Sequence, residues 1–221
     1  MNSEPINYTN RNSVFLGIDH NPEKLNIFDK KKRLANLYII SGCNGAGKTT
    51  ASYTVLPDML NCKEFVNADE IARGLSPFQP DKVAIEAGRI MLNRIQELMK
   101  QKVDFAFETT LATRSYKNFV KEAQMNGYFV TLVYFWLNSI DLAIERVGTR
   151  VLAGGHNIPE DTIRRRYLSG IKNLSEIYMP ICDYWMIFDN SENPPLVVAK
   201  GSKNTDKQVY GLDIYNQIIE Q

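Results

Sequence analysis

From residue 36 onward, hydrophobic and polar residues follow two alternating patterns. Short apolar runs predict buried strands, and longer segments with apolar residues three and four positions apart predict amphipathic helices. The predicted strands span residues 37–40, 64–67, 103–107, 128–137 and 184–188. The predicted helices span residues 49–56, 80–102, 115–126, 140–153 and 161–178. This alternation predicts a three-layer α/β fold, in which helices cover both faces of a parallel sheet of five or more strands.

Both ends of the chain depart from this pattern. Residues 1–35 are rich in asparagine, their hydrophobic residues are scattered, and they predict an N-terminal appendage. Asn21 and Pro22 are typical of a helix start within it. At the other end, residues 192–221 predict an edge strand at 196–199 and a last helix at 212–220. The core of the fold is therefore expected within residues 36–191.

The composition is that of a globular protein with no strong charge. The chain has 221 residues, of which 44% are hydrophobic and 23% charged, and its formal net charge is +1. No global field would attract nucleic acid or an acidic membrane, so any site for a polyanion must be local. The three cysteines have no metal-binding or disulfide spacing, which favours a reducing compartment. The polar N-terminus and the short apolar run at 129–137 predict a soluble, cytoplasmic protein without membrane contact.

One glycine-rich segment carries a specific chemical signal. Residues 42–49 fit G-x-x-x-x-G-K-[ST], the phosphate-binding loop, between a predicted strand and a predicted helix. Its glycines let several backbone N–H groups face one anion, Lys48 would reach the terminal phosphates of a nucleotide, and the Thr49 hydroxyl would hold Mg²⁺. The expected nucleotide-binding residues are Gly42, Asn44, Gly45, Ala46, Gly47, Lys48, Thr49 and Thr50.

Two carboxylates follow strands at the sheet edge where a nucleotide would bind. Asp69 comes after the second predicted strand and is the candidate general base, since phosphoryl transfer to an alcohol needs an acceptor for the hydroxyl proton. The alternative is that Asp69 only caps a helix beginning at Glu70. Glu108 follows the third predicted strand and could face Mg²⁺ through water or hold the acceptor. Its alternative is an ordinary loop acid.

A basic cluster predicts a lid over the phosphates. Arg146 and Arg150 lie four residues apart on one helix face. Three further arginines, at 164–166, follow a glycine-rich loop that contains His156. An arginine-bearing flap at about residues 148–166 would spread the phosphate charge and exclude water. Only some of the three consecutive arginines can face the site, because neighbours on a helix diverge.

These residues together resemble the zeta-toxin family of P-loop kinases over residues 37–190. The resemblance is closest to a chromosomal branch often labelled as predicted ABC-type ATPases, although residues 168–172 only begin like the Leu-Ser-Gly-Gly-Gln signature of that class. Beyond the phosphate-binding loop, the motifs that carry the resemblance are Val66-Asn67-Ala68-Asp69, Phe107-Glu108-Thr109-Thr110, Ile144-Glu145-Arg146 and a lid that ends in Pro159.

The resemblance implies transfer of the γ-phosphate of ATP or GTP to a sugar hydroxyl of UDP-N-acetylglucosamine, with Mg²⁺, and an antitoxin as a partner protein. Asp69 then matches the base, Lys48 the loop lysine and Arg146 a phosphate-clamping arginine. The family's second lid arginine falls near His156, so Arg150 and Arg164 are candidates to replace it. The residues that this likeness assigns to the acceptor are Glu108, Thr110, Arg73 and Glu86.

Two other functions fit the same loop. A nucleotide-binding switch or slow ATPase would act through a partner protein and have a shallow acceptor pocket. A polynucleotide-end kinase would need a basic, aromatic-lined groove, against which the near-neutral charge argues.

Overall fold

A computed structural model describes residues 34–155, 157–203 and 205–220 of the chain. The predicted appendage, apart from its last two residues, and the helix expected within it lie outside these ranges. His156 also lies outside them. Within the described residues, no helix is both long and apolar enough to cross a membrane.

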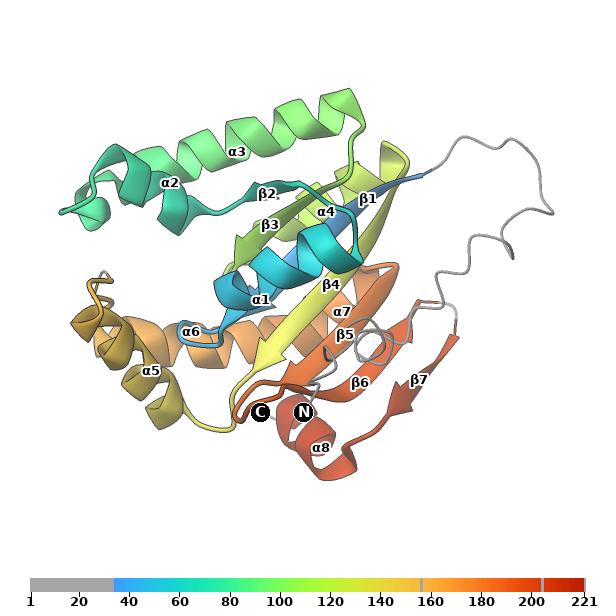
Figure 1. The fold of residues 1–221 in the computed structure, drawn as a ribbon. Helices are drawn as coiled ribbons and strands as arrows, with labels where there is room; N and C mark the ends of the chain where they lie inside the picture. Colours follow the sequence, from blue (N-terminus) through green and yellow to red (C-terminus); the bar gives the residue numbers. More distant parts are fainter. Residues whose placement is uncertain (1–33, 156, 204, 221) are drawn as a thin grey trace, which may run out of the picture. The chain divides into compact units, whose positions relative to one another are not determined.

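A seven-stranded sheet forms the centre of the molecule, in the order β2-β3-β1-β4-β5-β6-β7 (Figure 1). Its strands are β1 (Ala35–Gly42), β2 (Glu64–Val66), β3 (Phe105–Thr109), β4 (Tyr128–Trp136), β5 (Tyr184–Asp189), β6 (Leu196–Ser202) and β7 (Thr205–Val209). The first five in this order pair in parallel, and β6 and β7 are antiparallel. The predicted α/β fold with a parallel sheet of five or more strands is confirmed.

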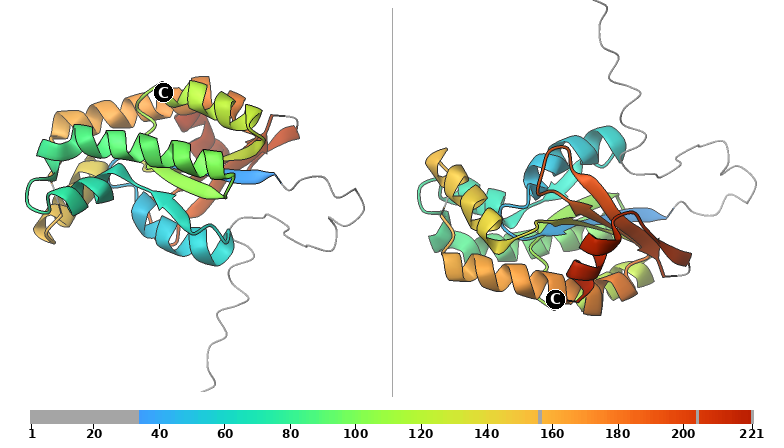
Figure 2. Two further views of the ribbon diagram at one scale, coloured as in Figure 1. Left: turned by 90° about the horizontal axis from the view of Figure 1, so that it is seen from above. Right: turned by 90° about the horizontal axis from the view of Figure 1, so that it is seen from below.

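Helices cover both faces of the sheet, as predicted. Their bounds are α1 (Lys48–Thr54), α2 (Ala68–Leu75), α3 (Ala84–Gln101), α4 (Tyr116–Met125), α5 (Ile140–Leu152), α6 (Glu160–Asn173), α7 (Met179–Ile181) and α8 (Leu212–Ile219). Figure 2 shows α1 on one face, and α4 and α6 on the opposite face. The central strands are therefore covered on both sides, which explains their nearly continuous apolar sequence. Leu37 and Ile39 of β1, for example, are fully buried.

Two predicted elements at the N-terminal and C-terminal parts of the core were wrong in detail. The helix expected to end before Pro57 continues as a π-helical turn, η2 (Val55–Met59), where Leu60 N–H bonds to the Val55 carbonyl at 3.1 Å. A wider turn accommodates proline, which lacks an N–H and clashes with the carbonyl four residues earlier in an α-helix. The helix expected over 161–178 likewise ends as a π-helical turn, η4 (Leu174–Tyr178).

The strand expected at the sheet edge is internal. β6 lies between β5 and β7, so β7 forms the edge. The sequence of β7, Thr-Asp-Lys-Gln-Val, has no apolar alternation, so the hydrophobic pattern did not reveal this strand.

A single carboxylate, Asp183, ties the start of β5 to its neighbours. Asp183 accepts hydrogen bonds from the Val130 backbone N–H at 2.9 Å, from Gln124 Nε2 at 3.0 Å and from Lys203 Nζ at 2.8 Å. Burial alone would raise the pKa of this carboxyl, but the three donors together lower it below its usual value. The ionised form therefore stabilises the fold.

We expect Asp183→Ala to lower the free energy of unfolding by about 2 kcal/mol at pH 7, because hydrogen bonds to a charged acceptor are lost and the Val130 N–H is left unsatisfied. Since folding lowers this pKa, the contribution is present above about pH 4, the ordinary aspartate value, and is lost as the pH falls below it. Urea titrations at neutral and acidic pH measure the difference. Glu145→Ala, at an exposed site on α5, is the matched control; equal losses in the two variants would contradict the assignment.

Candidate functional site

The glycine-rich loop between β1 and α1 has a backbone that only glycine adopts easily. Gly45 and Gly47 have φ angles of 80° and 76°. A Cβ atom would lie 2.7 Å from the Ala143 carbonyl oxygen at the first and 2.5 Å from Asn190 Nδ2 at the second. Gly47 is also the residue before α1, whose first N–H groups have no partner within the helix. The positive end of α1 therefore lies at this loop, an arrangement that favours anions.

Lys48 and Thr49, the first residues of α1, meet the carboxylate of Glu108 at the end of β3. Lys48 Nζ donates to the Cys43 carbonyl at 2.8 Å and lies 3.6 Å from Glu108 Oε1. Thr49 Oγ1 donates to Glu108 Oε2 at 2.7 Å. The lysine and glutamate side chains are both nearly buried, at 7% and 9% exposure, so each compensates the charge of the other.

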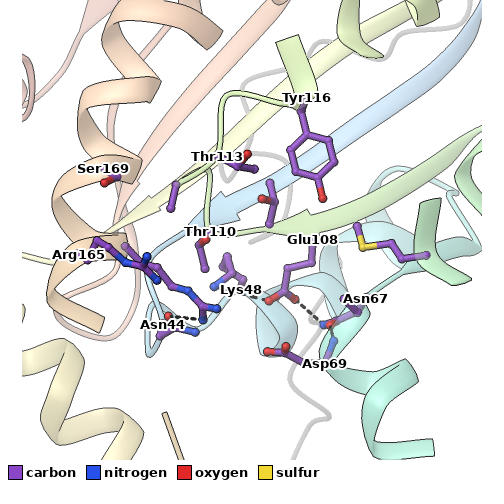
Figure 3. Close-up of a pocket in the computed structure, with 15 residues that line it drawn as sticks. Asn44, Lys48, Asn67, Asp69, Glu108, Thr110, Thr113, Tyr116, Arg165 and Ser169 are labelled. Atoms are coloured by element: carbon purple, nitrogen blue, oxygen red, sulfur yellow. Dashed lines mark hydrogen bonds and ion pairs between the residues drawn. The ribbon is translucent and has the colours of Figure 1, made fainter. Parts of the chain in front are cut away.

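Asp69 lies in the first turn of α2 and does not cap this helix. The cap is Asn67, whose Oδ1 accepts the backbone N–H of Asp69 at 2.8 Å and that of Glu70 at 3.4 Å. The alternative of Asp69 as a cap is therefore wrong: Asn67 is followed by the helical residue Ala68, which moves the helix start two residues earlier than expected. The Asp69 carboxylate is exposed and faces the cavity described next (Figure 3).

Two pockets meet at this site. One has a volume of about 260 Å³ and lies over the glycine-rich loop and the start of α1, bounded by Arg146 and Arg150 of α5. The other, of about 430 Å³, extends between α2, the end of β3 and α6, and Thr110 lines it (Figure 3). The residues that line both pockets are Asn44, Lys48, Asp69 and Glu108. The two cavities thus join where the loop lysine and the two carboxylates lie.

The expected nucleotide-binding residues lie together around the smaller pocket. Six of them line it, namely Asn44, Gly45, Gly47, Lys48, Thr49 and Thr50. The other two do not line it. Gly42 is buried at the end of β1, and Ala46 is buried within the loop, where its carbonyl accepts a hydrogen bond from Asn190 Nδ2 at 2.8 Å.

Arg146 is held by backbone carbonyls beside the smaller pocket. Its guanidinium donates to the Asn190 and Ser191 carbonyls, each at 2.7 Å. Together with the Asn190 bond to Ala46, these contacts attach the segment after β5 to the glycine-rich loop. Arg146 therefore connects α5 to the segment after β5, beside the smaller pocket that it lines.

The three consecutive arginines of α6 point in different directions. Arg164 pairs with Glu160 at 2.6 Å and with Asp141 at 3.5 Å, on the surface. Arg165 and Arg166 instead line the larger pocket, and Arg166 donates to Asn44 Oδ1 at 3.2 Å. Burial lowers the pKa of Arg166. The negative charge of Asp69 opposes this shift, and the positive charge of Arg165 adds to it. Arg164, one of the two arginines expected to replace the second lid arginine, therefore lies on the surface and lines neither pocket, whereas its two neighbours line the larger one.

Two other candidates do not reach the described pockets. Arg73 pairs with Glu70 at 3.4 Å on the outer part of α2, and Glu86 is exposed in the first turn of α3. Neither lines the two cavities.

The structure adds residues to the larger pocket that the sequence did not single out. These are Asn67, to which the sequence assigned no role of its own, and Met91, Ala112, Thr113, Tyr116 and Ser169. The position of Asn67 between a strand and a helix was a usable signal, since asparagine is a preferred cap. The others come from three separate helices and a loop, and only tertiary packing brings them together.

The oxygen atoms of this site fit a magnesium ion whose ligands come partly from the protein and partly from a nucleotide. Thr49 Oγ1 and Glu108 Oε2 lie side by side at the loop. The described residues contain no cluster of three or more histidine, cysteine, aspartate or glutamate side chains able to bind a metal unaided. Mg²⁺ commonly uses one or two protein oxygens together with phosphates and water, so the donor set here agrees with that mode.

The chain is similar to known proteins in sequence and in fold. The family model for zeta toxins matches residues 23–193. An uncharacterized protein of Haemophilus influenzae is 33% identical over 126 residues, which cover 57% of this chain and 88% of that protein.

Among solved structures, the toxin–antitoxin system PezAT of Streptococcus pneumoniae contains a chain with a TM-score of 0.60 and 16% identity, over 90% of this chain and 84% of that one. The complex AvrRxo1-ORF1:-ORF2 with ATP contains a chain with a TM-score of 0.69 and 15% identity. The matched region includes 84% of our chain but only 64% of that chain. At these identities the structures show a shared fold.

All three cysteines are buried, and one lies within the glycine-rich loop. Burial raises the pKa of Cys43 to about 11, that of Cys62 to about 11 and that of Cys182 to about 12. Cys43 is only 2% exposed although it belongs to the loop. The thiolate, which is the reactive form, is therefore scarce in the folded protein.

We expect the three thiols to resist a disulfide reagent in the native protein at pH 8 and to react fully after denaturation. Folding raises these pKa values, so the neutral thiols stabilise the folded state. This contribution to the free energy of unfolding is complete below about pH 8.5, the ordinary thiol pKa, and is lost as the pH rises through the pKa values of the folded protein. Thiol titration with and without urea measures the first effect, and urea unfolding at increasing alkaline pH measures the second. Rapid labelling of Cys43 in the native state would contradict the observed burial.

Proposed function

The chain belongs to the zeta toxin family, and we propose that it is a kinase that transfers the γ-phosphate of ATP or GTP to a hydroxyl group of a small molecule. The observation that carries this proposal is the junction of the two pockets at Lys48, Asp69 and Glu108. A phosphotransferase needs two binding sites that share one reaction point, whereas a nucleotide-dependent switch needs only one. The size of the second pocket, about 430 Å³, favours an acceptor over a partner-controlled ATPase.

In this proposal the smaller pocket binds the triphosphate. The N–H groups of the glycine-rich loop and the start of α1 would bind phosphate oxygens, and Lys48 would turn from the Cys43 carbonyl and Glu108 toward the terminal phosphates. Thr49 and Glu108 would hold Mg²⁺, which when bound neutralises charge on the phosphates. Positioning and charge stabilisation would supply most of the rate enhancement.

The larger pocket would hold the acceptor, with its hydroxyl between Asp69 and the γ-phosphate. The hydroxyl oxygen forms a bond to the γ-phosphorus, the bond from that phosphorus to the oxygen of the β-phosphate breaks, and the hydroxyl proton passes to Asp69. The nucleoside diphosphate leaves from the smaller pocket. Asp69 suits this role because its carboxylate is exposed and lines both cavities, while the helix cap that it might have served is supplied by Asn67.

A nucleotide sugar such as a UDP-N-acetylsugar fits the chemistry of the larger pocket. Arg165 and Arg166 could pair with a diphosphate, and Thr110, Thr113 and Ser169 offer hydroxyl groups to a sugar. We also propose an antitoxin-type partner protein. A toxin–antitoxin system among the proteins with this fold, and membership of the zeta toxin family, support it.

We expect Asp69→Asn to reduce phosphate transfer by about 10²- to 10⁴-fold, which is the usual contribution of a general base. Lys48→Ala should abolish transfer because it also weakens nucleotide binding. Radiolabelled ATP offered with UDP-sugars, nucleosides, oligonucleotides or no acceptor would measure transfer and identify the acceptor class. Calorimetry should show that Asp69→Asn still binds ATP.

Glu70→Gln is the matched control for Asp69→Asn. Glu70 is the next residue on α2, and its carboxylate pairs with Arg73 away from the pockets. It should retain transfer within about twofold. Near-normal turnover of Asp69→Asn would exclude Asp69 as the base, and ATP hydrolysis unaffected by every acceptor would favour a switch or ATPase.

We expect Arg166→Met to raise the KM for an anionic acceptor by about 10-fold or more, since one charge-assisted contact contributes about 1.5–3 kcal/mol. Arg164→Met, on the same helix but paired with Glu160 on the surface, should leave this KM nearly unchanged. Steady-state kinetics of the two variants provide the comparison. The same KM in both would argue against an anion-binding role for this face of α6.

A further inference from the structure

Asn67 links the carboxylate of Glu108 to the backbone at the start of α2, where Asp69 lies (Figure 3). Its side chain is buried at 6% exposure. Nδ2 donates to Glu108 Oε2 at 2.9 Å, and Oδ1 accepts the N–H groups of Asp69 and Glu70. The amide orientation is determined by these partners, because the reverse would place oxygen against the carboxylate and nitrogen against two N–H donors.

The bond to Glu108 explains why an amide stands here, which capping alone does not. Aspartate and serine cap helices about as well as asparagine. An aspartate, however, would bring a second negative charge to hydrogen-bonding distance from Glu108, and a serine has no second polar atom with which to reach it. Of these caps, only asparagine serves both partners at neutral pH.

The same contacts form one continuous path through the site. Thr49 donates to Glu108, Glu108 accepts from Asn67, and Asn67 accepts from the backbone of Asp69. A displacement of Glu108 would therefore be transmitted both to the metal-facing hydroxyl and to the first turn of α2. The bond from Asn67 is therefore the contact that joins Glu108 to the start of α2.

We propose that Asn67 is a positioning residue for phosphoryl transfer, which holds Glu108 beside Lys48 and Thr49 and holds Asp69 at a set place over the pocket junction. This inference rests on the function proposed above. It assigns no contact with the reacting atoms to Asn67. Its effect on the reaction is exerted through the two carboxylates.

The test is Asn67→Asp, which keeps the cap and replaces the donor by a charge. At pH 8 we expect kcat to fall by about 10- to 100-fold, the usual range for residues that orient a metal-facing group, while the KM for ATP changes by less than about twofold. At acidic pH the loss should shrink, because a proton shared by the two carboxyl groups restores a donor to Glu108. A residue needed only for capping would show no such pH dependence.

A second measurement does not depend on catalysis. Two carboxylates in contact repel each other, so the stability of Asn67→Asp relative to wild type should be greatest below about pH 4, the ordinary carboxyl value, and should decline as the pH rises toward 8. The difference in melting temperature between Asn67→Asp and wild type, called the gap below, should therefore grow as the pH rises. The gap should become independent of pH when Glu108→Gln is added, since one carboxylate then remains.

Two further variants serve as controls. Asn118→Asp adds the same charge at an exposed position of α4 and should give no comparable gap. Asn67→Ser keeps a capping oxygen without a charge, so it should lose kcat while its stability difference from wild type stays constant with pH.

The outcomes separate the two proposals. A melting-temperature gap for Asn67→Asp that does not change with pH, or a kcat within twofold of wild type at pH 8, would overturn the role of Asn67. Failure of the wild-type protein to phosphorylate any acceptor would instead remove the proposed kinase function. Together, the pH-dependent gap and the loss of kcat would support the inference.

Discussion

The pairing of β3 beside β1 determines the chemistry of this molecule. In their parallel register Ile40 lies opposite Glu108, so the glutamate lies at the carboxyl ends of the strands, where the glycine-rich loop begins. There it lies 3.6 Å from Lys48 and accepts a hydrogen bond from Thr49. A buried lysine or glutamate alone would be strongly destabilising, and each is tolerated because the other is present. The loop lysine, the Thr49 hydroxyl and the residue that caps α2 all contact this carboxylate.

Charge in this protein is organised locally. The formal net charge is only +1, yet the two joined pockets gather Lys48, Arg146, Arg150, Arg165 and Arg166 around two carboxylates. The cations face the places proposed for phosphates, and the carboxylates lie at their junction. Such an arrangement can bind a compact polyanion without giving the surface a general attraction for nucleic acid.

The arginines of α6 illustrate how a helix selects among neighbouring residues. Successive residues are turned by about 100° around the axis, so three in a row cannot share one face. Arg165 and Arg166 line the acceptor-sized pocket, and Arg164 pairs with Glu160 and Asp141 on the outside. A basic run in the sequence thus contributes two residues to the pocket and one to the surface. The family membership of the chain does not by itself indicate which ones.

The sequence alone determined the α/β architecture, the glycine-rich loop and the carboxylates at the ends of strands two and three. Those features follow from local periodicity and from a contiguous motif, since parallel strands bring their carboxyl ends to one edge. Tertiary structure decided the rest: that Asn67 caps α2 and bonds to Glu108, that Arg166 and not Arg164 reaches the loop, and that β7 forms the edge. Each of these depends on the rotation of a helix or on pairing between distant segments, and no local pattern records such long-range packing.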